Sequence, residues 1–242
     1  MPIPFPRPAA VLLAAALASA PALAAEMTAE EVKRLALEAI LENPEIVMEA
    51  VGILQEREET TRQDAARSAV AAEREALIAD APVLGDPVGD VAVVEFFDYN
   101  CPYCRRAKPV LSELMSDDPG VRVVGREWPI LGEGSVFAAR AALAARAQDL
   151  YEPFHWALMG MSGRAERDSV LRVAEEVGLD VARLLADMDA PEIDAHIAES
   201  MRLAELLGFS GTPSFVVGET LLPGLVDAET LAEAVARVRD AR

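Results

Sequence analysis

Two adjoining stretches near the middle of the chain limit its possible folds more than any others. The run from Val91 to Phe97 is β-branched and aromatic, which is typical of a buried strand. Shortly after it the chain carries Cys101-Pro102-Tyr103-Cys104, and Pro102 is suited to the first turn of a helix. The sequence therefore predicts a buried strand, a turn bearing two cysteines, and a helix in succession.

Further strands are predicted on both sides of a long helical region. One is expected from Val121 to Val124, and two more from Ser214 to Val217 and from Thr220 to Leu222. Residues 135–207 lie between them and are helical in pattern, and a last helix is expected after Asp227, a residue type that caps helices. This order predicts an α/β sheet domain with an inserted set of helices.

The region before the sheet domain is helical in pattern from residue 28 to 79, with a break at Asn43-Pro44. Its first half carries an apolar stripe too long for an isolated helix pair to bury. The stripe consists of Val32, Leu35, Ile40, Leu41, Ile46, Val47, Val51, Ile53 and Leu54. Residues 56–75 instead interleave acidic, basic and alanine residues, which favours a solvated helix.

These patterns predict three parts after the terminus: an association module over residues 25–54, a charged connector over 55–80, and the main domain over 81–242. A homo-oligomer formed through residues 28–54 would cover the apolar stripe. The alternative is that the stripe folds back onto the main domain.

The first 24 residues have the features of a secretion signal. Arg7 precedes an apolar run from Ala9 to Ala20, which ends at the small-residue site Ala22-Leu23-Ala24. The run is too short to cross a bilayer, which needs about 20 apolar residues. We therefore expect cleavage near Ala24 and an exported protein.

Charge and cysteine count exclude some functions and favour others. The chain has 22 Lys and Arg against 41 Asp and Glu, a net charge of −19, so nucleic acid is not expected as a partner. An exported protein stabilised by disulfides usually carries several cysteines, whereas this chain has 2, both in one Cys-x-x-Cys. The pair is therefore expected to serve chemistry.

The position of the pair at a helix start suits redox chemistry. Backbone N–H groups and the positive end of the helix dipole stabilise a thiolate at Cys101, which makes it the expected nucleophile. Cys104, one turn later, is the expected resolving thiol. The cations Arg105, Arg106 and Lys108 would lower the pKa of Cys101 further where they lie near its sulfur.

Metal binding is the main alternative for the pair. A structural zinc site needs two further ligands, and the only histidines, His155 and His196, lie far apart within the helical insert. His155 sits among aromatic residues and is better explained as a structural histidine. Cu(I) remains open, because two soft thiolates, Cys101 and Cys104, suit that ion.

The segment Glu95-Phe-Phe-Asp-Tyr-Asn-Cys-Pro-Tyr-Cys104, with Pro109 in the next helix and Gly211-Thr-Pro-Ser-Phe215 later, resembles the DsbA family of thioredoxin-fold thiol–disulfide oxidoreductases. The resemblance covers roughly residues 82–240. It implies a thioredoxin fold with a helical insert, a cis Pro213 against the cysteine pair, and substrate contacts from Thr212. Pro102 and Tyr103 would support the active site, and no cofactor is implied.

Glu95 matches a buried acid that in this family is thought to help move protons. Its neighbours Val94 and Phe96 independently suggest burial, which raises the pKa of a carboxyl group and suits it to proton transfer. The alternative is an ordinary strand acid facing the surface.

The stretch Asn43-Pro-Glu-Ile-Val47 and the charged helix after it resemble the N-terminal appendage of ScsC-type relatives of DsbA, and the choice of Tyr103 with Thr212 resembles isomerases. This implies a periplasmic, oligomeric disulfide isomerase or reductase, kept reduced by a membrane partner and acting on misfolded or reduced exported proteins. The alternatives are a DsbA-like oxidase, a Cu(I)-binding copper-tolerance protein, or a redox-silent chaperone.

Overall fold

A computed structural model describes residues 27–242 of the chain, so the predicted signal segment lies outside the described residues. The chain divides into two compact units, the first ending at Gln55 and the second running from Glu56 to Arg242. Within the described residues, no helix combines the length and the apolar character that crossing a membrane requires.

The described part of the first unit is helical. Helix α1 spans Ala29–Glu42 and α2 begins at Glu45, so the break falls at the predicted Asn43-Pro44. Thr28 starts α1 with a capping box: its hydroxyl accepts from the Glu31 N–H, and the Glu31 carboxylate accepts from the Thr28 N–H at 2.9 Å.

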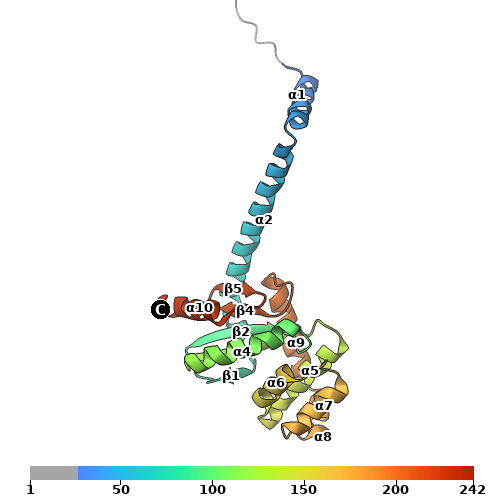
Figure 1. Ribbon diagram of the computed structural model, residues 1–242, viewed down its shortest axis with the longest axis vertical. Coiled ribbons are helices and arrows are strands. Elements are labelled where there is room, and N and C mark those ends of the chain that lie inside the picture. The colour runs from blue at the N-terminus through green and yellow to red at the C-terminus, as the bar shows by residue number, and fades with distance from the viewer. Residues whose placement is uncertain (1–26) are drawn as a thin grey trace, which may run out of the picture. The chain divides into compact units, whose positions relative to one another are not determined.

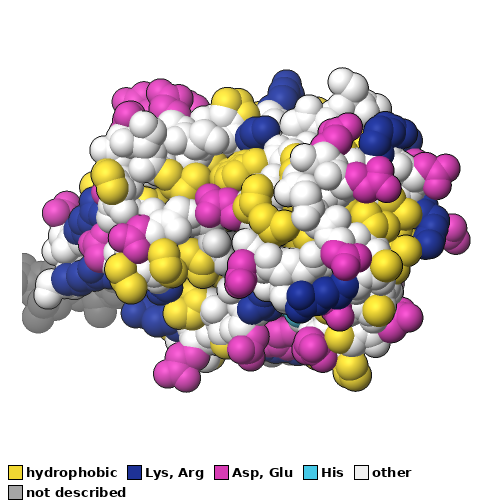
Figure 2. All heavy atoms as spheres, turned by 90° about the horizontal axis from the view of Figure 1, so that it is seen from below, with side chains coloured by type: hydrophobic (Ala, Val, Ile, Leu, Met, Phe, Trp, Pro, Cys, Tyr) yellow, Lys and Arg dark blue, Asp and Glu magenta, His cyan; other side chains and the backbone are white. Residues whose placement is uncertain are grey.

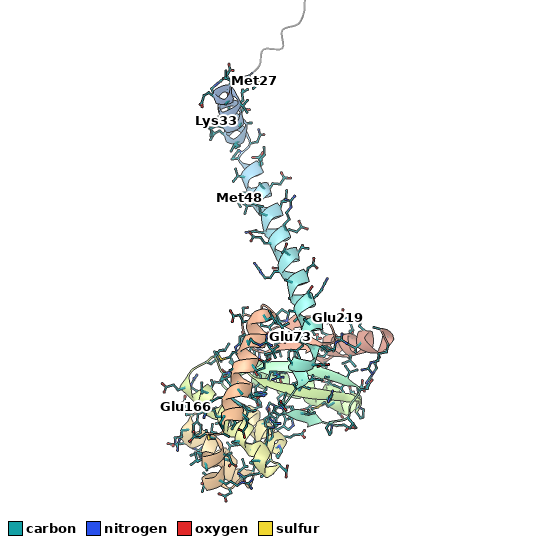
Figure 3. All side chains as sticks on the ribbon, turned by 180° about the vertical axis from the view of Figure 1, so that it is seen from behind. Met27, Lys33, Met48, Glu73, Glu166 and Glu219 are labelled. Atoms are coloured by element: carbon teal, nitrogen blue, oxygen red, sulfur yellow. The ribbon has the colours of Figure 1, made fainter. Side chains whose placement is uncertain are left out.

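All residues of this unit from 27 to 55 are exposed, including its large apolar side chains. Leu41 is 71% exposed and Met48 is 70% exposed. Figure 3 labels Lys33 and Met48 on these helices and Met27 just before α1. The apolar side chains of the predicted stripe are therefore exposed on these helices.

The second unit contains a five-stranded sheet with helices on both sides and a helical insert. Its strands are β1 (Val83–Gly85), β2 (Val91–Phe97), β3 (Val121–Glu127), β4 (Ser214–Val217) and β5 (Thr220–Pro223). Its helices are the remainder of α2 (Glu45–Ala72), then α3 (Arg74–Ile78), α4 (Pro102–Asp117), α9 (Pro191–Leu206) and α10 (Ala228–Asp240). The insert holds α5 (Glu133–Ala144), the short 3₁₀ helix η1 (Ala145–Gln148), α6 (Tyr151–Gly160), α7 (Arg167–Glu176) and α8 (Val181–Asp187) and leads into α9.

The sheet has the strand order β1-β3-β2-β4-β5, with β2 at its centre. Strands β2 and β3 are parallel and α4 connects them, whereas β4 pairs antiparallel with β2 and β1 with β3. This is the α/β fold expected from the sequence, with the cysteines at the end of the central strand. Figure 1 shows α4 lying across the sheet and α5–α8 gathered to one side of it.

Side chains along β2 point alternately to the two faces of the sheet and pack into both core clusters. Val93 and Phe97 belong to the cluster shared with α4 and α10, whereas Val94 and Phe96 belong to the cluster shared with α3 and α9. Glu95 has the parity of Val93 and Phe97, so it faces the side of α4. The strand thus places one carboxyl group beneath the helix that begins at the cysteines.

The boundaries agree closely with those predicted for β2, for the start of α4, for β4 and for α10. The sequence missed β1, because Val83–Gly85 is only three residues long and ends in a glycine, a residue that is depleted in strands. Strand β3 continues to Glu127, three residues past the predicted end, with Gly125 and Arg126 inside it. Glycine and arginine are poor indicators of a strand, which explains the early end.

The end of α2 is buried against the main domain to a greater extent than its charged composition suggests. Ala66 and Val70 are buried, and Val70 belongs to the core cluster shared with α9. Glu73, which follows α2 and is labelled in Figure 3, pairs with Arg202 of α9 at 2.8 Å. The charged connector predicted from the sequence is therefore solvated in only part of its length.

Charged side chains are spread over the second unit. The face seen in Figure 2 shows acidic and basic groups interspersed, with hydrophobic side chains reaching the surface between them. On that face the acidic surplus does not form a single patch.

Arg126 ties α3 to the sheet. Its guanidinium is buried in β3 and donates to the carbonyl oxygens of Leu77 at 3.0 Å and Ala79 at 2.9 Å, and also to that of Ala76. These carbonyls form the open end of α3, which has no later turn to pair with.

We predict that Arg126→Met lowers the free energy of unfolding by about 2 kcal/mol, because it leaves buried carbonyl groups without donors. Urea unfolding followed by circular dichroism measures this change. Arg237→Met is the control, since Arg237 makes only an exposed pair with Glu233 and its loss costs about 0.5 kcal/mol or less. Equal stability of the two variants would contradict the anchoring role.

Candidate active site

The cysteine pair lies where β2 ends and α4 begins. Cys101 is the N-cap of α4, Pro102 is its first residue, and both sulfur-bearing residues are buried. The turn before them is fixed by its own backbone, because the Cys101 N–H donates to the Asp98 carbonyl at 3.0 Å. The setting predicted from the sequence is therefore present.

The Cys101 thiol is strongly acidified. A hydrogen bond from the Cys104 thiol lowers the pKa of Cys101 most, and the Thr212 side chain and the backbone N–H groups of Cys104 and Tyr103 lower it further. Burial opposes them, and the pKa of Cys101 lies at about 5. In its protonated form the sulfur donates to the Thr212 carbonyl at 3.2 Å.

The cations predicted to lower the pKa of Cys101 mostly bind other groups. Arg105 donates to the carbonyl oxygens of Tyr99 and Met161, at 3.0 and 3.2 Å, and to that of Gly163. Lys108 donates to the Trp156 carbonyl at 2.7 Å. These two cations hold the insert against α4, and the Cys104 thiol is the largest cause of the low pKa of Cys101.

Cys104 has the opposite electrostatic environment. Burial raises the pKa of its thiol far above the ordinary value, and the hydrogen bond to Cys101 and the charge of Glu95 raise it further. One sulfur is therefore charged at neutral pH while the other keeps its proton.

Glu95 lies beneath the pair as its position in β2 requires. Burial, and next the charge of Cys101, raise the pKa of its carboxyl group to about 8. Its Oε1 is buried and has no hydrogen-bond partner among the described residues. Of the two interpretations of Glu95 from the sequence, the buried acid matches the geometry.

Thr212 and Pro213 approach the pair from the loop before β4. The Thr212-Pro213 peptide bond is cis, and Pro213 is buried. The Thr212 carbonyl lies 3.2 Å from the Cys101 sulfur. The structure therefore brings together Glu95, Cys101, Cys104, Thr212 and Pro213, while Tyr103 stays 51% exposed at the rim.

Two polar residues that the sequence did not single out fix the loop before Cys101. The Asp98 carboxylate accepts from the N–H groups of Asn100 at 2.7 Å and Leu131 at 2.9 Å. The Asn100 side chain donates to Ser135 and to the Ala165 carbonyl, both at 3.1 Å, and accepts from the Ala165 N–H at 2.8 Å. Both residues are turn formers, so the sequence alone gave no sign of these distant partners.

The two histidines belong to a buried network. His155 lies 3.1 Å from the Tyr99 hydroxyl, and burial lowers the pKa of its ring to about 4, so it is neutral at pH 7. His196 Nε2 lies 2.7 Å from Glu127, which also accepts from Tyr151 at 2.7 Å. His155 thus has the structural role favoured by the sequence, and neither ring joins the cysteines.

Within residues 27–242, no group of three or more His, Cys, Asp or Glu side chains is arranged to hold a metal ion. A four-ligand zinc site therefore has no set of donors in this part of the chain. The Cu(I) alternative has the two sulfurs of Cys101 and Cys104 alone.

A thioredoxin-type sheet with a cysteine pair at the start of α4 and a cis proline beside it defines a domain of the thioredoxin class. Residues 92–236 match the family described as the DSBA-like thioredoxin domain, and the chain belongs to this family.

Two solved structures illustrate the relationship. A thioredoxin-like oxidoreductase from Silicibacter pomeroyi is 64% identical, covers 70% of this chain and 99% of its own, and superimposes with a TM-score of 0.69. Proteus mirabilis ScsC, in a transitional conformation, is 31% identical over 88% of this chain and 97% of its own, with a TM-score of 0.65. The second likeness extends to much of the N-terminal region.

A longer curated relative also matches. The Na⁺/H⁺ antiporter NhaA 3 from Salinispora tropica is 34% identical over 155 residues, which are 63% of this chain. The chain spans 24% of that protein's length, so the similarity concerns a part of it.

We predict that the Cys101 thiolate, followed by absorbance at 240 nm, titrates with a midpoint near pH 5. Cys104→Ser should change this midpoint, because the Cys104 thiol is the largest cause of the shift. Because the folded pKa is lowered, the stabilisation that the thiolate provides is complete above its unfolded pKa of about 8.5 and is lost as pH falls through 5. A midpoint near 8.5 would contradict the site geometry.

The ionisation of Glu95 makes stability depend on pH in the opposite direction. Its folded pKa of about 8 exceeds the ordinary 4.5, so stability is lost as pH rises between these values. We predict that Glu95→Gln, which stays neutral, loses less stability than the wild type from pH 5 to pH 9 in urea unfolding, and that it slows disulfide exchange. Parallel stability profiles and unchanged exchange rates would remove Glu95 from the mechanism.

Proposed function

We propose that the protein exchanges disulfides with exported polypeptides through Cys101 and Cys104, and that it acts as an oligomeric isomerase or reductase. The observation that supports this best is the division of charge within the pair. Cys101 has a pKa of about 5, whereas that of Cys104 is raised well above the ordinary range. Such a pair has one nucleophile ready at neutral pH and one thiol held in reserve.

The chemistry follows from this division. The Cys101 thiolate attacks one sulfur of a substrate disulfide, an intermolecular S–S bond forms, and the other substrate sulfur leaves as a thiolate and takes a proton. In isomerisation that substrate thiol, once deprotonated again, attacks a different sulfur, and a substrate thiolate later displaces Cys101. No net electrons pass to the substrate.

Reduction uses Cys104 as well. Cys104 loses its proton and attacks Cys101, so the Cys101–Cys104 disulfide forms and the substrate leaves with two electrons and two reduced sulfurs. We assign the ionised form of Glu95 the acceptance of the Cys104 proton, because its carboxyl group lies beneath the pair and affects the pKa of Cys104. In the mixed disulfide Cys101 carries no charge, which removes one of the two causes that raise the pKa of Glu95 and so favours its ionised form. A membrane redox partner would then return the pair to its dithiol form.

The first unit supports the isomerase interpretation. Its exposed apolar side chains are arranged on helices α1 and α2, and further copies of the chain are the proposed cover for them. Residues 28–54 would form the association module. Several catalytic domains held together raise the effective concentration of thiolates around one misfolded substrate.

The likeness to Proteus mirabilis ScsC over 88% of this chain is consistent with that proposal. Export to the periplasm is proposed with it, on the signal features of residues 1–24.

The alternative within the same chemistry is a DsbA-like oxidase, since stabilising the Cys101 thiolate also makes the disulfide form a stronger oxidant. No contact in the described residues favours Cu(I) binding over exchange. Copper titration of the reduced protein against Cys101→Ser would reveal tight stoichiometric binding if that alternative held.

We predict that the reduced full-length protein reactivates scrambled ribonuclease, and that Cys101→Ser abolishes this activity. A double variant, Leu35→Glu with Val47→Glu, should convert the oligomer to monomers in light scattering. It should lose isomerase activity while keeping the simple reduction of a small disulfide.

The matched control is Glu38→Gln with Glu49→Gln, which alters the same two helices without adding charge to the apolar residues. Inactive reduced protein, together with rapid oxidation of reduced ribonuclease by the disulfide form, would replace the isomerase proposal by the oxidase.

A further inference from the structure

A hollow of about 520 Å³ opens beside the reactive sulfur. The side chains of Tyr103 and Arg106 form one wall, from the first turns of α4. The loop 210–212 and the chain from Pro223 to Leu225 form the rest. Thr212 belongs both to this hollow and to the contact with Cys101 Sγ, so a substrate segment joined to Cys101 passes next to it.

Among the described residues, Arg106 is the only charged one that lines the hollow, although the chain holds 41 Asp and Glu. Its guanidinium lies over the Tyr103 ring, 4.5 Å from the ring centre, which orients it without using its N–H donors. Within the described part of the chain it makes no ion pair and no hydrogen bond. Arg105 and Lys108, by contrast, donate to backbone carbonyls.

We propose that Arg106 selects substrates that carry an aspartate or glutamate within one or two residues of the reactive cysteine. This rests on the proposed function, because it specifies the polypeptide that the exchange site prefers. A guanidinium binds a carboxylate through two parallel hydrogen bonds, and the flat Tyr103 ring beneath it fixes the plane of that fork.

The rest of the protein makes this local cation significant. With a net charge of −19, the chain as a whole repels acidic segments, so attraction must come from groups at the site itself. The Cys101 thiolate adds a further negative charge there. Arg106 offsets the negative charge of the chain and that of the thiolate at the position where a substrate side chain next to the mixed disulfide would lie.

The experiment uses the full-length reduced protein and three fluorescent peptide disulfides that differ only beside their cysteine, where they carry Glu, Gln or Lys. The second-order rate of mixed-disulfide formation is measured for each at pH 7 and at two salt concentrations. We expect the Glu peptide to react about three- to fivefold faster than the Gln peptide at low salt, with the ratio falling at high salt.

Two variants test the residue. Arg106→Ala should bring the Glu to Gln ratio to one, and Arg106→Glu should favour the Lys peptide. Because each ratio compares peptides on the same enzyme, a change in the reactivity of Cys101 cancels. Arg172→Glu is the matched control: it makes the same change in net charge at an exposed position of α7 that does not line the hollow, and it should keep the wild-type ratio.

The outcomes separate this inference from the proposed function. If Cys101→Ser reacts as fast as the wild type, thiol exchange through Cys101 is wrong. If all three peptides react through Cys101 at equal rates, or if the Glu preference survives in Arg106→Ala, the exchange stands and the selection by Arg106 is overturned.

Discussion

The hydrogen bonds that stabilise a thiolate at the start of α4 are the interaction on which the rest of the site depends. Cys101 is the N-cap of α4, and hydrogen bonding from the Cys104 thiol, then from Thr212 and from the backbone of Cys104 and Tyr103, lowers the pKa of its thiol. Ionising the Cys101 sulfur therefore takes little free energy. A negative charge on Cys104 would instead be buried near Glu95, which makes its ionisation unfavourable. The asymmetry of the pair is thus a consequence of where one helix begins.

The central strand makes that asymmetry possible. Strand β2 is hydrogen-bonded on both edges and packed on both faces, so its end, and with it the first turn of α4, is held firmly. Its alternation gives Val93 and Phe97 to one half of the core and Val94 and Phe96 to the other. Glu95 lies on the same face of the strand as Val93 and Phe97. The alternation that builds the core therefore also places this one polar side chain beneath the cysteines.

Features set by local pattern were predictable from the sequence, and features set by distant partners were not. The β-branched run predicted β2, Pro102 predicted the start of α4, and the neighbours Val94 and Phe96 predicted the burial of Glu95. Arg105 contacts Met161 and Gly163, and Lys108 contacts Trp156, all 48 or more positions away, and nothing local shows that these cations contact those carbonyls. The same holds for Asn100 with Ala165, and for Glu127, which joins Tyr151 and His196 only because three elements converge on it.

The loop between α6 and α7 illustrates what such distant contacts imply. Asn100 and Arg105 stand on either side of the cysteine pair, and both reach residues 161–165. Local unfolding of that loop would free both flanks of the motif in a single event. Opening of this loop would therefore remove contacts on both sides of the cysteine pair at once, and the bonds from Asp98 to Leu131 and from Asn100 to Ser135 would be among the distant contacts left to hold the reactive turn.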